Sequence, residues 1–515
     1  MLPPFVNEPF TDFTKPEQKA AYVAALAKAE AEAGRAWPLL IGGKHVTTKA
    51  TLESRNPCRW EQVVATFSKA GVKEAEAALD AAAKAFPEWS HTSVEERAGY
   101  LLRAAAILRR RKHEFSAVMT LEVGKTWAEA DGDTAEAIDF MEFYAREMLR
   151  IAAEDHVTPV AGEWNRQVMI PLGVCAVIPP WNFPLAILVG MTTAALVTGN
   201  TVVLKPASDS GWIAAKFAAL LEEVRIPAGV FNFVPGGGGE CGETIVRSPL
   251  TRLIAFTGSK EVGLHIHETA AKPDPKCRWI KRTVLEMGGK DAILVDEDYD
   301  PEEAATLIVQ SAFGFQGQKC SACSRAIIHK KIYDDVAKRV VEKVNALKVG
   351  DARDPATQMA SVINRVAQKT ILGYCEVGKK EGDLLAGGKP GDLAGCYVQP
   401  TVIGGVKSKA RIHCEEIFGP VLALLRCQHF EDGLRIVNST EFGLTGSVLT
   451  RNRKRIERAK AEFHVGNLYV NRKCTGALVG AHPFGGFNMS GTDSKAGGRE
   501  YLLLFTQAQT ISEKL

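Results

Sequence analysis

Cys320 is the strongest candidate for a reactive side chain in this sequence. It follows Lys319 directly, in the glycine-containing segment Phe315-Gln-Gly-Gln-Lys-Cys-Ser321. The thiolate is the nucleophilic form of cysteine, and a neighbouring cation lowers the pKa of a thiol. We therefore expect Cys320 to be a nucleophile, although free cysteines are more often small buried hydrophobes.

Cys320 and Cys323 also form a C-x-x-C pair. A redox pair or a zinc site is the less favoured interpretation, since no second C-x-x-C and no histidine cluster accompany it. We expect no metal site, and we expect Cys323 to pack in the core one helical turn beyond Cys320.

Asn182 and Glu286 would suit a covalent reaction at a carbonyl. Asn182 stands in the rigid turn Pro179-Pro-Trp-Asn-Phe-Pro184, where a fixed amide can stabilise an oxyanion. Glu286 stands among apolar residues and glycines, where burial would raise its carboxyl pKa toward that of a general base. Taken singly, each residue is better explained otherwise, Asn182 as an Asx-turn or helix-cap residue and Glu286 as an acid in a surface loop.

Residues 172–260 alternate short apolar strands with helices, which is typical of a parallel sheet covered on both faces. Ligands bind at the carboxyl ends of such strands. Lys205 ends the strand at 201–204 and could donate to ribose hydroxyls, although a lysine there is more often a solvated charge. Gly258 and Ser259 precede a helix whose N-terminus would suit a pyrophosphate.

The segment Gly237–Gly242 matches the dinucleotide fingerprint G-x-G-x-x-G. The match is weak, because it falls in a run of four glycines and follows the third strand of the block rather than the first. Gly238 remains a candidate for contact with a cofactor, near its adenine.

The elements that would hold these groups form two α/β units that meet near Gly288–Gly289. Composition and periodicity predict helices at 15–34, 72–86, 93–112, 113–122 and 126–153. A second alternating block combines helices at 301–314 and 331–347 with strands at 292–295, 324–329, 420–425 and 446–450.

Composition narrows the class of protein. The 515 residues should form two or three domains, and 46% hydrophobic with 24% charged residues is ordinary for a globular protein. A net charge of +3 argues against nucleic-acid and membrane-surface binding, and no apolar run is long enough to cross a bilayer. Eleven cysteines without a secretory signal predict reduced thiols in the cytoplasm.

Over about residues 40–515, the chain resembles the aldehyde dehydrogenase superfamily. The resemblance rests on Pro-Trp-Asn-Phe-Pro, Leu-Lys-Pro, Phe-Thr-Gly-Ser, Leu-Glu-Met-Gly-Gly-Lys, Gly-Gln-Lys-Cys, Glu416-Ile-Phe-Gly-Pro420 and Pro483-Phe-Gly-Gly486, in the family's order. Within it, the segments 317–325, 475–480 and 491–498 resemble the branch that oxidises L-glutamate γ-semialdehyde to L-glutamate.

The resemblance implies roles for the candidates. Cys320 would be the nucleophile, Asn182 and the Cys320 backbone N–H the oxyanion hole, and Glu286 the base for the deacylating water. The cofactor would be NAD, bound by Pro180, Trp181, Lys205, Ser208, Gly238, Gly258, Ser259, Glu416 and Phe418. Many NAD-preferring relatives carry Glu where this chain has Ser208, which leaves room for a 2′-phosphate and keeps NADP open.

The substrate would be held by its amino-acid head group. Ser321 and the turn amides of Gly476 and Ala477 would bind the carboxylate, since successive amides make an anion-binding concavity. Glu136 would accept the ammonium. Phe183 and Phe484 would flank the aliphatic chain, and Ser321 is equally explained as a helix-capping hydroxyl.

The implied fold is α/β, aldehyde dehydrogenase-like, with two parallel-sheet α/β domains and a small β oligomerisation arm. Residues 1–153 and 172–287, with part of 463–502, would form a discontinuous NAD-binding domain. Residues 288–462 would form the catalytic domain, and 154–171 with 503–515 the arm. The expected partners are the small-molecule semialdehyde, further copies of the chain in a homodimer or higher homo-oligomer, and a proline dehydrogenase.

Three alternatives stay open. The same chemistry could act on another semialdehyde or an aliphatic aldehyde. Cys320 could serve a thiol hydrolase with a histidine base, although nothing marks His265, His267 or His413 as that base. The chain could also be a non-catalytic protein on an enzyme fold, although every presumed catalytic side chain is present.

Overall fold

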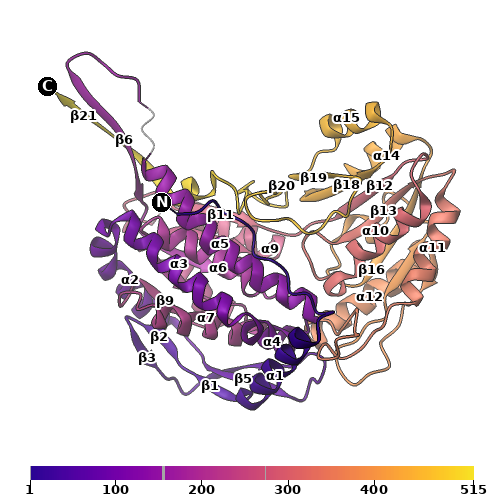
Figure 1. The fold of residues 1–515 in the computed structure, drawn as a ribbon, viewed down its shortest axis with the longest axis horizontal. Coiled ribbons are helices and arrows are strands. Elements are labelled where there is room, and N and C mark those ends of the chain that lie inside the picture. Colours follow the sequence, from indigo (N-terminus) through magenta and orange to yellow (C-terminus); the bar gives the residue numbers. More distant parts are fainter. Residues whose placement is uncertain (1, 154–156, 273) are drawn as a thin grey trace.

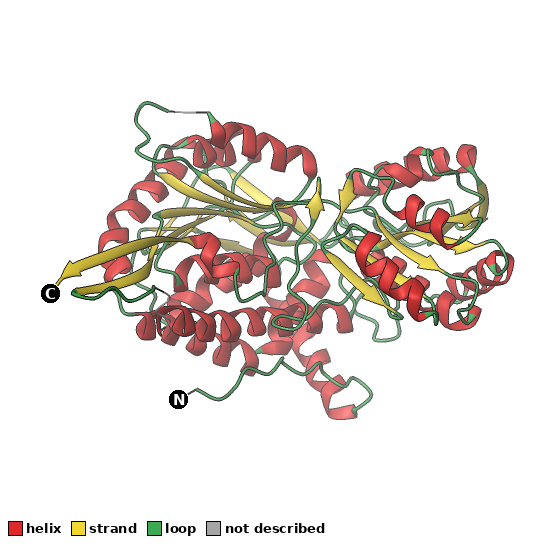
Figure 2. Cartoon of the chain, turned by 90° about the horizontal axis from the view of Figure 1, so that it is seen from above, coloured by secondary structure: helices red, strands yellow, loops and turns green. Residues whose placement is uncertain are grey.

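The computed structural model describes residues 2–153, 157–272 and 274–515, which build two seven-stranded sheets, a three-stranded sheet and a projecting two-stranded ribbon. A second two-stranded sheet pairs the short strands β17 (Phe442–Gly443) and β20 (Phe487–Asn488). The two large sheets lie in separate lobes, each covered by helices (Figures 1 and 2). None of the helices among the described residues combines the length and the apolar character that a membrane span requires.

The first sheet is mainly parallel. Its order is β11 (Arg282–Glu286), β10 (Thr251–Thr257), β7 (Val174–Ile178), β8 (Thr201–Leu204), β9 (Phe231–Phe233), β2 (Leu39–Ile41) and β3 (Lys44–Val46). β2 and β3 add to its edge in antiparallel pairing. β7 and β8 are buried along their whole length, which explains their continuous apolar sequences.

The second sheet is parallel except at one edge. Its order is β14 (Asp383–Ala386), β15 (Thr401–Gly404), β16 (Val421–Cys427), β13 (Cys323–His329), β12 (Asp291–Val295), β18 (Thr445–Leu449) and β19 (Asn467–Val470). Only β14 pairs antiparallel within this sheet. The chain passes from the first sheet to the second between β11 and β12, at Gly288–Gly289. β19 extends the second sheet beyond residue 462, the limit expected for that domain.

Helices cover both sheets. Those before residue 288 are α1 (Pro16–Glu32), α2 (Val72–His91), α3 (Val94–Arg110), α4 (Lys112–Val123), α5 (Trp127–Ala153), α6 (Ala186–Val197), α7 (Gly211–Glu223), α8 (Glu243–Arg247) and α9 (Lys260–Ala271). Those after it are α10 (Pro301–Phe313), α11 (Tyr333–Asn345), α12 (Arg365–Glu381), α13 (Arg411–Cys414), α14 (Phe430–Val437) and α15 (Arg453–Glu462). The short turns are η1 (Ser208–Ser210), η2 (Gly238–Gly242), η3 (Gly314–Gly317) and η4 (Tyr501–Phe505).

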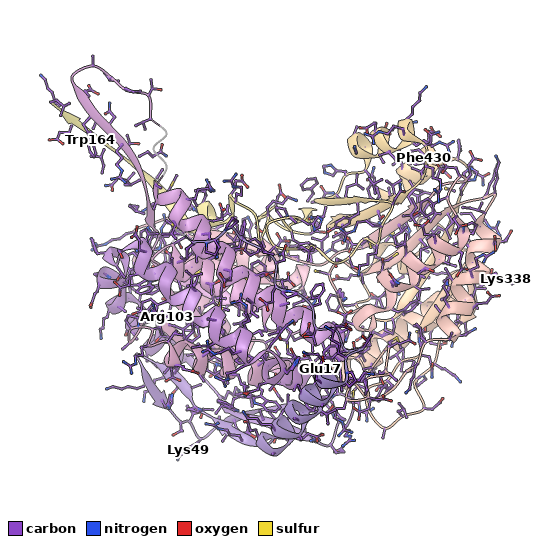
Figure 3. All side chains as sticks on the ribbon, viewed as in Figure 1. Glu17, Lys49, Arg103, Trp164, Lys338 and Phe430 are labelled. Carbon is purple, nitrogen blue, oxygen red and sulfur yellow. The ribbon has the colours of Figure 1, made fainter. Side chains whose placement is uncertain are left out.

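The ribbon consists of β6 (Glu163–Pro171) and β21 (Thr506–Lys514), paired antiparallel along their whole length. It projects from the first lobe, and Trp164 stands near its tip (Figure 3). At its base, the buried side chain of Asn200 accepts from the backbone N–H of Leu172 at 2.8 Å and donates to the carbonyl of Phe505 at 2.8 Å. The expected arm at 154–171 and 503–515 also covers residues 154–156, which lie outside the described residues, and its second strand begins at Thr506.

Two local expectations were incomplete or wrong. Cys323 is buried, as expected, but it begins strand β13 instead of lying a helical turn beyond Cys320. The predicted elements also lacked β1 (Arg35–Trp37), β4 (Thr51–Arg55) and β5 (Val63–Ser68), which form the three-stranded sheet. These short, partly exposed strands do not alternate clearly between apolar and polar residues, so their sequences do not predict strands.

Candidate functional site

The loop that carries Cys320 has an unusual backbone. Phe315, Gln316 and Gly317 follow one another in the left-handed region, with φ of 48°, 57° and 66°. Such a conformation costs roughly 1–2 kcal/mol for a residue with a side chain. A side chain on Gly317 would collide with the carbonyl of Gly419, so glycine is required there. The surrounding contacts must therefore hold this loop in place.

Two fully buried glutamines supply those contacts. The Gln316 amide donates to the carbonyl of Ser361 at 2.7 Å and accepts from the N–H of Ala360 at 3.1 Å. The Gln318 side-chain oxygen accepts from the N–H of Ile363 at 2.8 Å. The loop is thus fixed to residues 360–363, which precede α12.

Asn182 reaches the nucleophile loop from the other lobe. It follows β7, is buried, and donates its Nδ2 to the carbonyl of Gln318 at 3.1 Å. It caps no helix, because α6 begins after Leu185. This contact fixes the Asn182 amide against the loop that carries Cys320, two residues before it in the sequence.

Glu286 ends β11 and faces the same region. Its Oε1 accepts from the Ser494 hydroxyl at 2.5 Å, while its buried Oε2 has no hydrogen-bond partner among the described residues. Burial raises the pKa of Glu286 to about 8. Glu286 is therefore no ordinary surface acid, and it can exchange a proton near neutral pH.

One cavity of about 410 Å³ brings the reactive candidates together. Cys320 and Glu286 line it. All six residues expected to hold the substrate line it as well, namely Glu136, Phe183, Ser321, Gly476, Ala477 and Phe484. Asn182 is not among the lining residues and contacts the Cys320 loop at the carbonyl of Gln318. The sequence alone could not show that α5, the segment 475–480 and the Cys320 loop share one cavity.

Ser321 is almost fully buried at the cavity wall. No helix starts at this residue, because the chain enters β13 at Cys323, so the helix-capping interpretation is wrong. Gly476 adopts a φ of 80°, a turn conformation that favours glycine.

The sequence left open whether the neighbouring Lys319 lowers the pKa of the thiol. Its ammonium pairs with Glu129 at 2.7 Å. Burial raises the pKa of Cys320, and the nearby carboxylates of Asp291, Glu286 and Glu416 raise it further. Adjacency in sequence therefore did not predict which group the cation would neutralise.

The candidates from the sequence omit several charged residues in the cavity wall or paired with it. Lys125 and Asp133 form a fully buried ion pair at 2.9 Å, and Lys473 lies near Lys319 and Glu129. Burial and the charge of Asp133 raise the pKa of Glu136 to about 8. The spacing of Glu129, Asp133 and Glu136 places three acids on one face of α5, a signal that the sequence contained.

The cofactor candidates lie at the carboxyl ends of the first sheet. Lys205 is 8% exposed, its ammonium donates to the carbonyl of Gly236 at 3.3 Å, and burial lowers its pKa, so it is not a solvated charge. Side chains placed on Gly237, Gly238 or Gly239 would meet nothing within 4 Å, so these glycines border open space. Ser208 is exposed. Ser259 caps α9, and Gly258 precedes it.

Glu416 and Phe418 approach from the second lobe. Glu416 accepts from the N–H of Gly289 at 2.9 Å, and a side chain on Gly288 would collide with its carboxylate. Phe418 packs edge-on against Trp181, which follows Pro180, with 5.5 Å between ring centres. The open glycine segment, a buried amine and a carboxylate at the lobe boundary fit an extended dinucleotide.

A histidine base for Cys320 finds no support among the described residues. His265 and His267 are exposed and hydrogen-bond to Glu243 and Thr283. His413 is buried, its pKa is lowered to about 3 by burial and by Arg325, and it does not line the cavity.

Comparison with known proteins gives a consistent result. The model of the aldehyde dehydrogenase family matches residues 45–511. The 1-pyrroline-5-carboxylate dehydrogenase of Geobacillus thermodenitrificans (strain NG80-2) is 56% identical over 513 residues, which cover 100% of both chains. A solved structure of 1-pyrroline-5-carboxylate dehydrogenase from Thermus with bound NAD is 48% identical, with a TM-score of 0.98 and full coverage of both chains. Proline utilization A (PutA) from Bdellovibrio bacteriovorus is 43% identical with a TM-score of 0.98, over 99% of this chain and 53% of that one.

The environment of Cys320 predicts its reactivity toward iodoacetamide. Because burial and nearby carboxylates raise its pKa, we expect alkylation in the ligand-free protein to be slow at pH 7.5 and to keep rising beyond pH 9. Glu286→Gln removes one of those charges, so alkylation should become severalfold faster above pH 8, where the native carboxylate is ionised, and stay unchanged below it.

Peptide mass spectrometry would quantify the label at each cysteine. The half-buried Cys277, which does not line the cavity, serves as the internal control and should respond equally in both proteins. A Cys320 labelling rate that levels off by pH 8 would contradict the raised thiol pKa.

Proposed function

Since the chain belongs to the aldehyde dehydrogenase family, we propose that it oxidises L-glutamate γ-semialdehyde, which is in equilibrium with 1-pyrroline-5-carboxylate, to L-glutamate with NAD. The observation that carries the proposal is the single cavity lined by Cys320, Glu286 and all the head-group candidates. The names of similar full-length proteins and the NAD in a related structure support it.

Catalysis begins with a covalent bond. The Cys320 sulfur attacks the aldehyde carbon, its proton leaves to solvent or a nearby base, and the carbonyl oxygen becomes an oxyanion. The Asn182 amide and the Cys320 backbone N–H donate to that oxyanion. NAD, when bound, accepts the hydride, which leaves the substrate joined to Cys320 as a thioester.

Glu286 completes the cycle by activating water. A carboxyl group with a pKa of about 8 is partly ionised near neutral pH and can take a proton from water as it attacks the thioester carbon. The carbon–sulfur bond then breaks, which releases glutamate and restores the thiol. Ser494 holds one carboxyl oxygen, so the other is left to accept the proton.

The cavity walls suit an amino-acid head group. The Ser321 hydroxyl and the amides of Gly476 and Ala477 bind the carboxylate, and Glu136 accepts the ammonium. Phe183, whose ring lies 4.0 Å from the Lys125 ammonium, flanks the aliphatic chain opposite Phe484.

The first sheet and its neighbours hold the cofactor. Lys205 donates to the adenosine ribose, Gly258 and Ser259 approach the pyrophosphate, and Glu416 binds the nicotinamide ribose. The remaining candidate contacts are Pro180, Trp181, Ser208, Gly238 and Phe418. Ser208 leaves space beside the ribose, so NADP is a second cofactor that the site would accept.

The domain roles follow from these assignments. Residues 1–153 and 172–287 form the NAD-binding domain, and the unit that begins at residue 288 carries the nucleophile and includes β19.

The substrate arises from proline oxidation, with a proline dehydrogenase as partner. The similarity to a longer protein of proline utilization supports this proposal. The eleven free cysteines favour a reducing compartment such as the cytoplasm.

The proposed function is tested by NADH absorbance with pyrroline-5-carboxylate. We expect kcat/KM to be higher for glutamate semialdehyde than for propanal, and Cys320→Ala to abolish NADH formation with both. Cys323→Ala, three residues away and outside the cavity, is the matched control and should keep activity. A higher kcat/KM for propanal would contradict the proposed substrate.

Asn182→Ala should slow the acylation step by about 10²–10³-fold, because it removes one oxyanion donor. The NADH burst in a single turnover reports that step directly. The variant should retain NAD binding, which intrinsic fluorescence titration would check. An unchanged burst rate would contradict the role of Asn182.

The ribbon of β6 and β21 should mediate a homo-oligomer. An isolated two-stranded ribbon is marginally stable and leaves its edges unpaired, and Trp164 and Ile511 are 44% and 39% exposed on it. We expect Trp164→Lys with Ile511→Lys to lower the mass in multi-angle light scattering. Val366→Lys, on the exposed face of α12, should leave that mass unchanged. A wild-type monomer would contradict the proposal.

A further inference from the structure

The segment Phe5–Phe13, here called the N-terminal strap, forms part of the wall of the substrate cavity. It has no regular secondary structure and runs over α5 before α1 begins (Figure 1). Phe10 and Thr11 line the cavity together with Cys320. The strap lies before residues 45–511, the part that matches the family model, although the similar full-length proteins span it as well.

Two buried aspartates of α5 hold the strap. Asp131 accepts from the Thr11 N–H at 2.8 Å and from its hydroxyl at 2.5 Å. Asp139 accepts from the Glu8 N–H at 2.6 Å. Lys112 adds a bridge, because its ammonium donates both to the Pro9 carbonyl and to Asp131 at 2.9 Å. These contacts fix the backbone of the strap along the helix that also carries Glu136.

Asn7 connects the strap to a second wall. Its Nδ2 donates to Asp139 on α5 at 2.8 Å and to the carbonyl of Val479 at 3.0 Å. Both amide hydrogens are therefore used, one on each side. Val479 belongs to the segment 475–480, which also contains Gly476 and Ala477. Asn7 thus joins the helix and the turn, both of which line the cavity.

Aromatic packing supports the same junction. Phe5 stacks edge-on against Phe143 of α5, with 5.2 Å between ring centres. Gly480 adopts a φ of 79°, and a side chain there would approach both rings to about 3.1–3.2 Å. Gly480, at the end of the turn, therefore packs against the rings of Phe5 in the strap and Phe143 in α5.

We propose that Asn7 is a positioning residue that sets the spacing between α5 and the turn 475–480, and thereby determines selectivity for aldehydes with an amino-acid head group. This inference rests on the proposed function. The ammonium of such a substrate meets Glu136 on α5, and its carboxylate meets the amides of Gly476 and Ala477. Because binding groups must be held within about half an ångström of their productive positions, a tie between these two elements controls both contacts together.

Asn7→Ala removes both hydrogen bonds and tests the inference. We expect the KM for glutamate semialdehyde to rise about tenfold, since the two hydrogen bonds that join α5 to the turn are lost. The KM for propanal, which has no head group, should change less than twofold, and kcat with propanal should persist. Asn7→Asp, which keeps the shape but cannot donate, should show at least the same loss.

The matched control is Thr14→Ala, beyond the strap, where the hydroxyl donates to the exposed Asp12. It should leave both KM values unchanged. Hydrogen exchange gives a second readout: Asn7→Ala should speed amide exchange in residues 476–480, and Thr14→Ala should not.

Equal effects of Asn7→Ala on both substrates, or no effect on either, would overturn the positioning role. Failure of the proposed function is a separate result, because it would appear as a preference of the wild-type protein for propanal. Even if the wild-type protein prefers propanal, hydrogen exchange still tests whether Asn7 holds the turn. Amide exchange in residues 476–480 that is the same in Asn7→Ala as in the wild type would overturn that part of the inference.

Discussion

The hydrogen bond from Asn182 to the carbonyl of Gln318 is the contact on which the site depends. It joins a turn of the first sheet to the loop that carries Cys320 in the second lobe. That loop has three successive residues in the left-handed region, a conformation that persists only when surrounding contacts stabilise it. Gln316 and Gln318 fix it from one side and Asn182 from the other. The nucleophile and its oxyanion donor are therefore positioned by the same set of contacts.

Burial sets the chemistry of the groups placed there. It raises the pKa values of Cys320, Glu286 and Glu136 together, because each loses water without gaining a full counter-charge. Lys319 of the cavity wall pairs with Glu129, and the buried Lys125 pairs with Asp133. The resting site thus holds a protonated thiol and acids that titrate near neutral pH, which suits a cycle in which protons move at each covalent step.

Close backbone contact between the lobes explains the glycines beside Glu286. A side chain on Gly288 would collide with Glu416, and one on Gly289 would collide with the Cys320 carbonyl. The acid at the end of β11, the nucleophile loop and the acid from the second lobe therefore meet at a distance that only glycine permits. The strap adds a further contact between distant segments that line the cavity. The Asn7 side chain hydrogen-bonds both to α5 and to the turn 475–480, each more than a hundred residues away in the sequence.

The sequence by itself determined the strand–helix alternation, the passage between sheets near Gly288–Gly289 and the candidates Cys320, Asn182 and Glu286. These follow from local periodicity and from residue types whose chemistry is intrinsic. Only the tertiary structure decided that Lys319 neutralises Glu129 instead of lowering the Cys320 pKa, that β19 joins the second sheet, and that the strap lines the cavity. Those outcomes depend on which distant groups are brought into contact and on how much water they lose, and neither quantity is encoded in the spacing of neighbouring residues.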